Sequence, residues 1–324
     1  MTQKPQPEIA QIADWLANIY DGAVTEIAPI SGGFWSAAYT YRVGADEFVL
    51  RLSDMPDWFA IDAAAMQFTA PDLPIPEVID VGEALGHQYA ISRRHYGRFV
   101  EDVSVEDADA VGGALKRLLA ALRAVPSTPD NAIVWHEPDA TAGLTWCDFL
   151  RSGLIDKPDS IVSGWRKKLA ENGRIEAIFK ACESRIEELL PYCPERRDLV
   201  HGDLLHQNVL ISEDATRVTA IFSWKCSVRG DFLFDIAWCT FWGSWHPGIA
   251  AADLWWRTLN APELSETDMI DAPLRHHCYE LQIAASHFGW NVWTGNDQEL
   301  AAVAAGAELV LERGPLQYRS SHAF

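Results

Sequence analysis

A polar turn in the second half of the chain holds a carboxylate and an amide at a spacing that could do chemistry. It reads Leu199-Val200-His201-Gly202-Asp203-Leu204-Leu205-His206-Gln207-Asn208-Val209-Leu210-Ile211. In phosphoryl transfer a carboxylate orients the acceptor hydroxyl and takes its proton, and an amide oxygen holds Mg²⁺ on the phosphates. Asp203 and Asn208 fit these two roles. The alternative is that Asp203 caps a turn and Asn208 adopts a strained loop conformation.

The pattern of apolar residues around this turn predicts the elements that must position it. Residues 8–20 show helical spacing, and residues 27–30, 37–43 and 47–52 show the period of two that is typical of strands. A helix over 60–69, an extended segment over 73–79 and a strand over 89–92 follow. From residue 100 the texture is mostly helical, with helices over 104–124 and 175–190 and two short strands, 209–211 and 218–222, on either side of a polar turn.

This order predicts an α+β protein with two lobes. Residues 1–95 form a small lobe with an antiparallel sheet, residues 96–324 form a larger and mainly helical lobe, and the hinge lies at about 91–96. The 324 residues are enough for both cores. The helical lobe contains the polar turn.

The amino-acid composition disfavours several classes of function. The formal net charge of −20 disfavours nucleic acid and anionic lipid as partners and favours a small cationic substrate. The six cysteines show no zinc-type spacing, and we interpret them as reduced thiols. No secretory signal and no apolar run of membrane-spanning length is visible, so we expect a cytoplasmic protein without a membrane partner, and a monomer.

Several short motifs together resemble a known enzyme family. They are His201-Gly202-Asp203 with Asn208, Leu73-Pro74-Ile75-Pro76-Glu77-Val78, Ile91-Ser92-Arg93-Arg94, Thr145-Trp146-Cys147-Asp148-Phe149 and Cys193-Pro194-Glu195 through His201. Their order and spacing resemble the aminoglycoside phosphotransferase and choline kinase family, relatives of protein kinases, and within it the branch that acts on hygromycin. The resemblance spans roughly residues 25–250. It implies a two-lobed protein-kinase-like fold, ATP or GTP as phosphate donor, Asp203 as general base and Asn208 as magnesium ligand.

The resemblance also implies a nucleotide site in the first lobe. Ser31-Gly32-Gly33 would bring backbone N–H groups to phosphate oxygens, although such a pair of glycines is also typical of a plain tight turn. Arg51 takes the strand position where most kinases have a phosphate-binding lysine; the alternative is a solvated arginine at a strand edge. Asp62 would be its carboxylate partner, or else a solvated aspartate in the first turn of a helix.

The predicted hinge, Ile91-Ser92-Arg93-Arg94-His95, would contact the nucleotide base. There we assign Ser92 and Arg94 to the nucleotide site.

The sequence departs from the family at the second metal position. The family has Ile-Asp-Trp after the strand that follows the catalytic loop, whereas this chain has Ser223 in Ile221-Phe222-Ser223-Trp224. A neutral hydroxyl is a poorer ligand for Mg²⁺ than a carboxylate, so the change puts activity in question. Downstream, Asp231 and Asp235 match the family's G-D-x-x-x-D-x-A. We expect Asp231 to brace the catalytic loop and Asp235 to be structural.

For the acceptor, the resemblance implies contacts from Gln207, Trp242 and Trp245, with Asp203 orienting the hydroxyl. Aromatic faces suit sugar rings and ammonium groups, but a chain with 14 tryptophans will also bury many of them. Five acids in the last third could meet ammonium groups, although most are expected to be ordinary surface charges: Glu263, Glu266, Asp268, Asp271 and Glu280.

Three functions remain open. The first is phosphate transfer to a hygromycin-like aminoglycoside or aminocyclitol. The second is a kinase-like binding protein, or an inactivated variant, because of Ser223. The third is a kinase for another small alcohol such as choline or homoserine, because the catalytic loop does not encode the acceptor.

Overall fold

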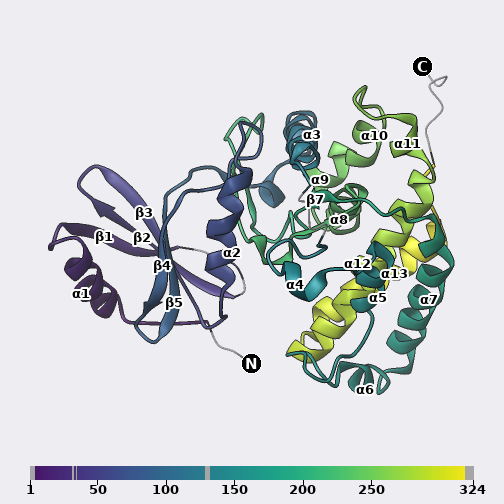
Figure 1. Ribbon diagram of the computed structural model, residues 1–324, viewed down its shortest axis with the longest axis horizontal. Coiled ribbons are helices and arrows are strands. Elements are labelled where there is room, and N and C mark those ends of the chain that lie inside the picture. The colour runs from purple at the N-terminus through teal and green to yellow at the C-terminus, as the bar shows by residue number, and fades with distance from the viewer. Residues whose placement is uncertain (1–3, 31–32, 34, 128–131, 318–324) are drawn as a thin grey trace. The chain divides into compact units, whose positions relative to one another are not determined.

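The computed structural model describes residues 4–30, 33, 35–127 and 132–317. Contacts divide the chain into two compact units (Figure 1). The first, which we call the sheet unit, consists of Met1–Asp102 and Asp203–Cys226. The second, the helical unit, consists of Val103–Gly202 and Ser227–Phe324.

The sheet unit is built on a five-stranded antiparallel sheet in the order β1-β2-β3-β5-β4. Its elements before the hinge segment are α1 (Ile9–Ile19), β1 (Val24–Ile30), β2 (Ser36–Val43), β3 (Asp46–Ser53), α2 (Trp58–Ala65), β4 (Val78–Ala84) and β5 (His87–Arg93). Side chains of β3 alternate between the two faces of the sheet. Leu50 and Leu52 pack with Ile12 and Leu16 of α1 in a buried core. Arg51 therefore faces the other side, where α2 lies.

A second, three-stranded sheet completes the sheet unit in the order β6-β8-β9. Its elements are β6 (Arg98–Phe99), the 3₁₀ turn η2 (Val100–Asp102), β8 (Val209–Ile211), β9 (Val218–Ile221) and the 3₁₀ turn η5 (Trp224–Cys226). The N–H of Ile221 donates to the carbonyl of Pro74 at 3.0 Å, which ties β9 to the chain before β4. These bonds place residues 203–226 with the sheet, whereas the sequence prediction assigned everything after residue 95 to the helical lobe.

The helical unit is organised around the long helix α12, which packs against α8, α7 and α13. Its helices are α3 (Ala108–Ala124), α4 (Pro138–Thr141), α5 (Trp146–Ser152), α6 (Trp165–Leu169), α7 (Gly173–Leu189), α8 (Leu233–Gly243), α9 (Pro247–Ala252), α10 (Leu254–Leu259), α11 (Glu266–Met269), α12 (Ala272–Thr294) and α13 (Asp297–Arg313). One strand pair, β7 (Asp198–Val200) with β10 (Val228–Gly230), joins the chain before and after residues 203–226. The α+β architecture expected from the sequence is confirmed.

Helix boundaries differ from the sequence prediction at two places. The helix expected to start at Ser104 begins instead at Ala108, because residues Val105–Asp107 form a 3₁₀ turn and the Ser104 side chain does not cap the backbone. The helix expected over 60–69 spans Trp58–Ala65 and continues as a 3₁₀ turn to Phe68.

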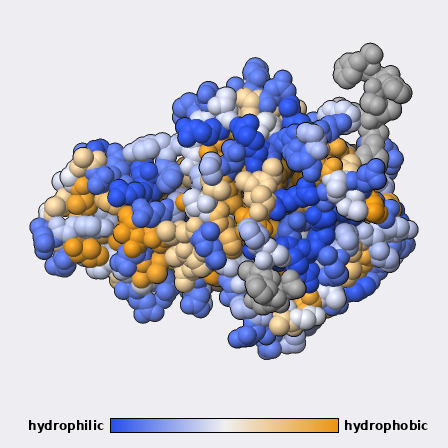
Figure 2. All heavy atoms as spheres, turned by 45° about the horizontal axis from the view of Figure 1, so that its top comes forward, coloured by the Kyte–Doolittle hydropathy of each residue, from blue (hydrophilic) through white to orange (hydrophobic). Residues whose placement is uncertain are grey.

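The surface is mixed in polarity. On the face shown in Figure 2, hydrophilic residues cover most of the area and hydrophobic residues form separate groups. Within the described part of the chain, none of the helices combines the length and the hydropathy needed for a membrane crossing. All six cysteines are free thiols, as expected.

Candidate active site

Hydrogen bonds close the loop that carries Asp203 and Asn208. The Asn208 Nδ2 donates to the Asp203 carbonyl at 2.8 Å, and the Asn208 carbonyl accepts the N–H of Phe222 at 2.8 Å. The loop and the segment before Ser223 are thus bonded to each other inside the sheet unit. Asn208 is 7% exposed and does not have a positive φ; the left-handed residues are its neighbours His206 and Gln207. The alternative in which Asn208 itself takes up the strain of the loop is wrong.

The Asp203 carboxylate contacts an imidazole. The His206 Nδ1 lies 2.8 Å from Asp203 Oδ1, and the Asp203 side chain is 20% exposed. A carboxylate that is held in place yet reachable from solvent suits a group that must accept a proton from a bound hydroxyl. Gln207, four residues after Asp203, is exposed.

The start of the loop is anchored by Asp235 rather than by Asp231. The two oxygens of Asp235 accept the N–H groups of His201 and Gly202, each at 2.8 Å, and the Asp235 side chain is buried. The expectation that Asp231 braces the loop is therefore wrong, whereas Asp235 has the structural role expected of it. Asp235 lies in the first turn of α8, from which its carboxylate reaches the backbone at the start of the loop.

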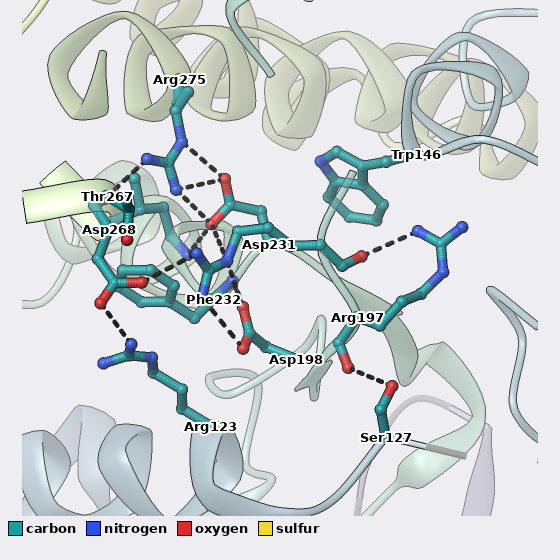
Figure 3. Close-up of polar contacts among 12 residues, drawn as sticks. Arg123, Ser127, Trp146, Arg197, Asp198, Asp231, Phe232, Thr267, Asp268 and Arg275 are labelled. Carbon is teal, nitrogen blue, oxygen red and sulfur yellow. Dashed lines mark hydrogen bonds and ion pairs between the residues drawn. The ribbon is translucent and has the colours of Figure 1, made fainter. Parts of the chain in front are cut away.

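Asp231 instead belongs to a buried network of ion pairs in the helical unit (Figure 3). Its carboxylate accepts from Nε and an Nη of Arg275 at 2.8 Å each and from the Tyr279 hydroxyl at 2.8 Å. Nearby, Asp268 pairs with Arg123 at 2.5 Å and with Arg196 at 2.9 Å. Burial acts to raise the pKa of Asp268, but bonds from Ser265 and the two guanidinium groups outweigh it and lower the pKa to about 2.

Arg51 and Asp62 form the ion pair that the sequence analysis predicts. The Arg51 Nη1 lies 2.7 Å from Asp62 Oδ2, with side-chain exposures of 17% and 8%. Both alternatives, a solvated arginine and a solvated aspartate, are wrong. The Asp62 Oδ1 accepts the N–H of Trp224 at 2.8 Å, so Asp62 connects Arg51 to the segment that carries Ser223.

The structure says less about the other residues that the sequence analysis assigns to the nucleotide site. Ser31 and Gly32 lie outside the described residues, and Gly33 has room for a Cβ, so its conformation does not demand glycine. Ser92 is a buried residue of β5. Arg94 pairs with Glu47 at 2.9 Å, and the Tyr96 hydroxyl donates to the same carboxylate. Nucleotide contacts by these residues stay predictions.

The residues present fit one protein ligand of Mg²⁺ and not the second. Because the Asn208 Nδ2 is bound to Asp203, its Oδ1 is the amide atom left to meet a cation. Ser223, at φ 66°, offers a hydroxyl where the resemblance described above leads us to expect a carboxylate. Within the described residues no cluster of three or more His, Cys, Asp or Glu side chains could hold a metal ion.

Trp242 and Trp245 lie in the helical unit and belong to one aromatic cluster. Their ring centroids are 5.3 Å apart, and Trp242 also contacts His287 and Phe241, at 4.8 and 5.0 Å. Trp242 is 6% exposed and Trp245 is 38% exposed. A Cβ on Gly306 would lie 2.8 Å from the Trp245 ring, so α13 fixes how that ring lies. Trp245 is thus partly open to solvent, whereas the Trp242 ring beside it is buried.

Two of the five acids considered for the acceptor are committed elsewhere. Asp268 is in the network described above. Glu280 is 1% exposed and is paired with Arg313 and with His276 at 3.3 Å. Burial acts to raise the pKa of Glu280, but His276, Arg313 and the Thr240 hydroxyl together lower it.

Sequence reasoning missed three residues of this site: Asp235 as the anchor, His206 beside Asp203, and Glu101. Glu101 accepts the N–H of Gln207 from a position 106 residues earlier in the chain. The spacing of Asp235 within the G-D-x-x-x-D motif could have pointed to it. No local signal marks Glu101, because only the fold brings it to the loop.

A sheet-bearing unit with a buried Arg–Asp pair, joined to a loop with an aspartate and an asparagine five residues apart, defines a kinase-like phosphotransferase. Comparison with known proteins agrees. The model of the phosphotransferase enzyme family known as APH matches residues 26–266, and the chain belongs to this family. The family expected from the sequence motifs, and the enzyme class that comes with it, are confirmed.

Individual relatives extend over nearly the whole chain. The chain is 26% identical to hygromycin-B 4-O-kinase of Escherichia coli, over 96% of this chain and 88% of that one. It is similar in structure to the aminoglycoside phosphotransferase APH(4)-Ia, with a TM-score of 0.81 at 24% identity, covering 95% and 100% of the two chains. A thermostable mutant of that enzyme, in ternary complex with AMP-PNP and hygromycin B, gives a TM-score of 0.79 at 25% identity, covering 93% and 98%. The kinase-like fold is confirmed.

Proposed function

We propose that this phosphotransferase moves the γ-phosphate of ATP to a hydroxyl of an aminoglycoside or aminocyclitol of the hygromycin kind, with GTP as the other possible donor. The observation that carries the proposal is the bonded arrangement of Asp203, Asn208 and the Arg51–Asp62 pair within one unit. The relatives named for hygromycin B support the acceptor class. The net charge of −20 suits a polycationic substrate.

In this proposal the residues of the sheet unit have different roles in phosphate transfer. Arg51, held by Asp62, directs the rest of its guanidinium fork to phosphate oxygens. Asp203 orients the acceptor hydroxyl and takes its proton as the acceptor oxygen bonds to the γ-phosphorus and the bond to the β-phosphate oxygen breaks, releasing the nucleoside diphosphate. Asn208 would hold a magnesium ion through Oδ1, and that ion, when bound, neutralises phosphate charge.

The acceptor is positioned by residues of a different kind. Gln207 lies next to Asn208 with an exposed side chain that can donate and accept hydrogen bonds. Trp245 presents an exposed ring to a sugar or an ammonium group, and Trp242 supports it. These contacts would give the enzyme its specificity for the acceptor, because the catalytic loop itself contacts only the hydroxyl group.

A second candidate function rests on Ser223. With a hydroxyl in place of the carboxylate, the scaffold could bind a nucleotide without transferring phosphate. Such a protein would be a kinase-like binder or an inactivated variant.

Two measurements on the purified chain separate these functions. The first is the melting temperature with ATP or GTP, with and without Mg²⁺, because a ligand of the folded state raises it. The second is phosphate transfer to hygromycin B, choline and homoserine. Transfer to hygromycin B with a magnesium-dependent rise in melting temperature supports the proposal. Nucleotide binding that is indifferent to Mg²⁺, without transfer, supports the binder, and transfer to choline or homoserine alone changes the acceptor class.

A further inference from the structure

A carboxylate outside the sequence motif touches the centre of the catalytic loop. Glu101 lies in η2, directly after β6, and its Oε1 accepts the backbone N–H of Gln207. Gln207 stands between the proposed base Asp203 and the proposed ligand Asn208. Other hydrogen bonds of the loop, such as those from His206 to Asp203 and from Phe222 to Asn208, come from the loop itself or from the segment after it.

The bond falls where the loop most needs support. His206 and Gln207 are consecutive non-glycine residues in the left-handed region, with φ of 64° and 66°. L-residues with side chains rarely adopt this conformation, and two in a row persist only where surrounding contacts hold them. The His206 ring contacts Asp203, and the Gln207 N–H is held by Glu101.

Glu101 is itself on a rigid support. The strand before it, β6, pairs with β8, the strand that follows the loop, with Phe99 opposite Leu210. Gly97 makes this close approach possible, since it has φ of 150° and a Cβ there would lie 2.4 Å from the Ile211 carbonyl oxygen. Val100, next to Glu101, is fully buried. Glu101 therefore cannot shift without disturbing β8.

The carboxylate is held there at some cost to stability. Its Oε2 is buried and has no hydrogen-bond partner among the described residues. Burial raises the pKa of Glu101, and the bond from the Gln207 N–H offsets only part of that rise. A poorly solvated acid that contributes little to stability is typical of a functional site.

We propose that Glu101 is a positioning residue for phosphate transfer: by accepting the Gln207 N–H it holds the left-handed turn of the loop, and so sets where Asp203 and Asn208 lie. The link to catalysis rests on the proposed function, whereas the contact with the loop does not. Glu101 need not touch the substrate, since it acts through the backbone at residue 207.

The test uses three variants of the full chain. Glu101→Ala removes the acceptor of the bond, and Glu101→Gln keeps an acceptor oxygen without the charge. Asp102→Ala is the matched control, because it removes an exposed carboxylate from the same 3₁₀ turn. Amide hydrogen exchange at Gln207 reports the contact directly, and kcat and KM for both substrates report its effect on the reaction.

For Glu101→Ala we expect exchange at Gln207 to quicken by about tenfold and kcat to fall by about tenfold or more, since small displacements of a catalytic group are costly. The KM for nucleotide should stay within about twofold, because Arg51 is untouched. Glu101→Gln should restore both readouts, and Asp102→Ala should resemble the wild type.

Unchanged exchange and kcat in Glu101→Ala would overturn the proposal, and so would a Glu101→Gln protein as impaired as Glu101→Ala. If Glu101→Ala does not fold, Glu101→Asp provides the same comparison, because its shorter side chain draws the oxygen away from Gln207. A wild-type protein without any transfer would refute the proposed function, while exchange at Gln207 would still decide whether Glu101 holds the loop.

Discussion

The carboxylates of the helical unit and those of the loop around Asp203 differ in burial and in their charge partners. In the helical unit, the buried carboxylate of Asp231 meets Arg275 and Tyr279, and the buried carboxylate of Asp268 meets Arg123 and Arg196 (Figure 3). In the loop, Asp203 is partly exposed and contacts His206, and residue 223 has a hydroxyl where the sequence comparison leads us to expect a carboxylate. The carboxylates of the helical unit are thus paired with cations inside the protein, whereas under the proposed function those of the loop meet charges that ligands bring.

The two regions also differ in where their non-glycine residues with positive φ lie. In the segment 203–226 three of the left-handed non-glycine residues, His206, Gln207 and Ser223, stand in or beside the proposed site. In the helical unit such residues among those described, Asp253 and Asp271, directly precede helices. A strained residue at a helix start serves the fold, but strain gathered around a reactive group is more typical of function.

Removing Asp231 from the ion-pair network of the helical unit should have the largest effect of all, and this effect should be on stability alone. Asp231→Ala leaves the Arg275 guanidinium buried without its partner, which should lower the free energy of unfolding by about 4 kcal/mol. Urea unfolding measures this, with Glu263→Ala, an exposed acid of the same unit, as a control expected to change it by less than about 0.5 kcal/mol. A loss below about 1 kcal/mol for Asp231→Ala would contradict the structural role given to the network.

Removing the base should act on the reaction and spare the fold. Asp203→Asn keeps the shape of the side chain but cannot accept the hydroxyl proton, so kcat should fall by about 10²- to 10³-fold while the melting temperature stays near that of the wild type. A nucleotide that still raises the melting temperature of this variant shows that binding survives. Asp203→Asn with near-normal kcat would remove Asp203 from the chemistry.

The two regions also differ in how far the sequence predicts them. The closeness of Asp203 and Asn208 follows from one continuous sequence motif, and the pairing of Arg51 with Asp62 is implied by the family resemblance. The roles of Asp231 and Asp235 do not follow, because both carboxylates belong to one motif and only the fold decides that Asp235, in α8, reaches the loop while Asp231, before α8, meets Arg275.

Long-range partners are the other limit of sequence reasoning. Glu101 and Gln207 are joined by the pairing of β6 with β8, two strands too short to be matched from their residues. The same holds for the grouping of residues 203–226 with the sheet, which depends on single backbone bonds such as that from Ile221 to Pro74.

Acid should weaken the helical network in a defined pH range. The pKa of Asp268 is about 2 in the folded state against 3.8 for an ordinary aspartate, so its contribution to stability is complete above about pH 4 and is lost as the pH falls toward 2. The shift corresponds to roughly 2 kcal/mol. Urea unfolding between pH 5 and 2 measures it, and Asp268→Asn should flatten this part of the pH dependence. An equally steep loss in that variant would assign the acid sensitivity to other groups.

Placing a carboxylate at residue 223 should have a smaller effect than the changes above. Unlike them, it should improve a property of the protein, its affinity for ATP. Ser223→Asp supplies the anionic oxygen that Mg²⁺ prefers, and aspartate tolerates the φ of 66° at this position. We expect the affinity for ATP in Mg²⁺ to rise by about tenfold, corresponding to about 1.4 kcal/mol, with no gain in EDTA. Calorimetry with the nucleotide measures it.

Ser223→Asn is the matched control for this change, because it has the shape and backbone preference of aspartate without the charge. If both variants gain equally, the backbone at 223 limits binding and not the missing charge. If Ser223→Asp gains nothing in Mg²⁺, residue 223 does not face the metal, and the contrast between a complete helical network and a loop that lacks one ligand would no longer hold. A gain confined to Ser223→Asp would show that this serine alone weakens an otherwise intact kinase site.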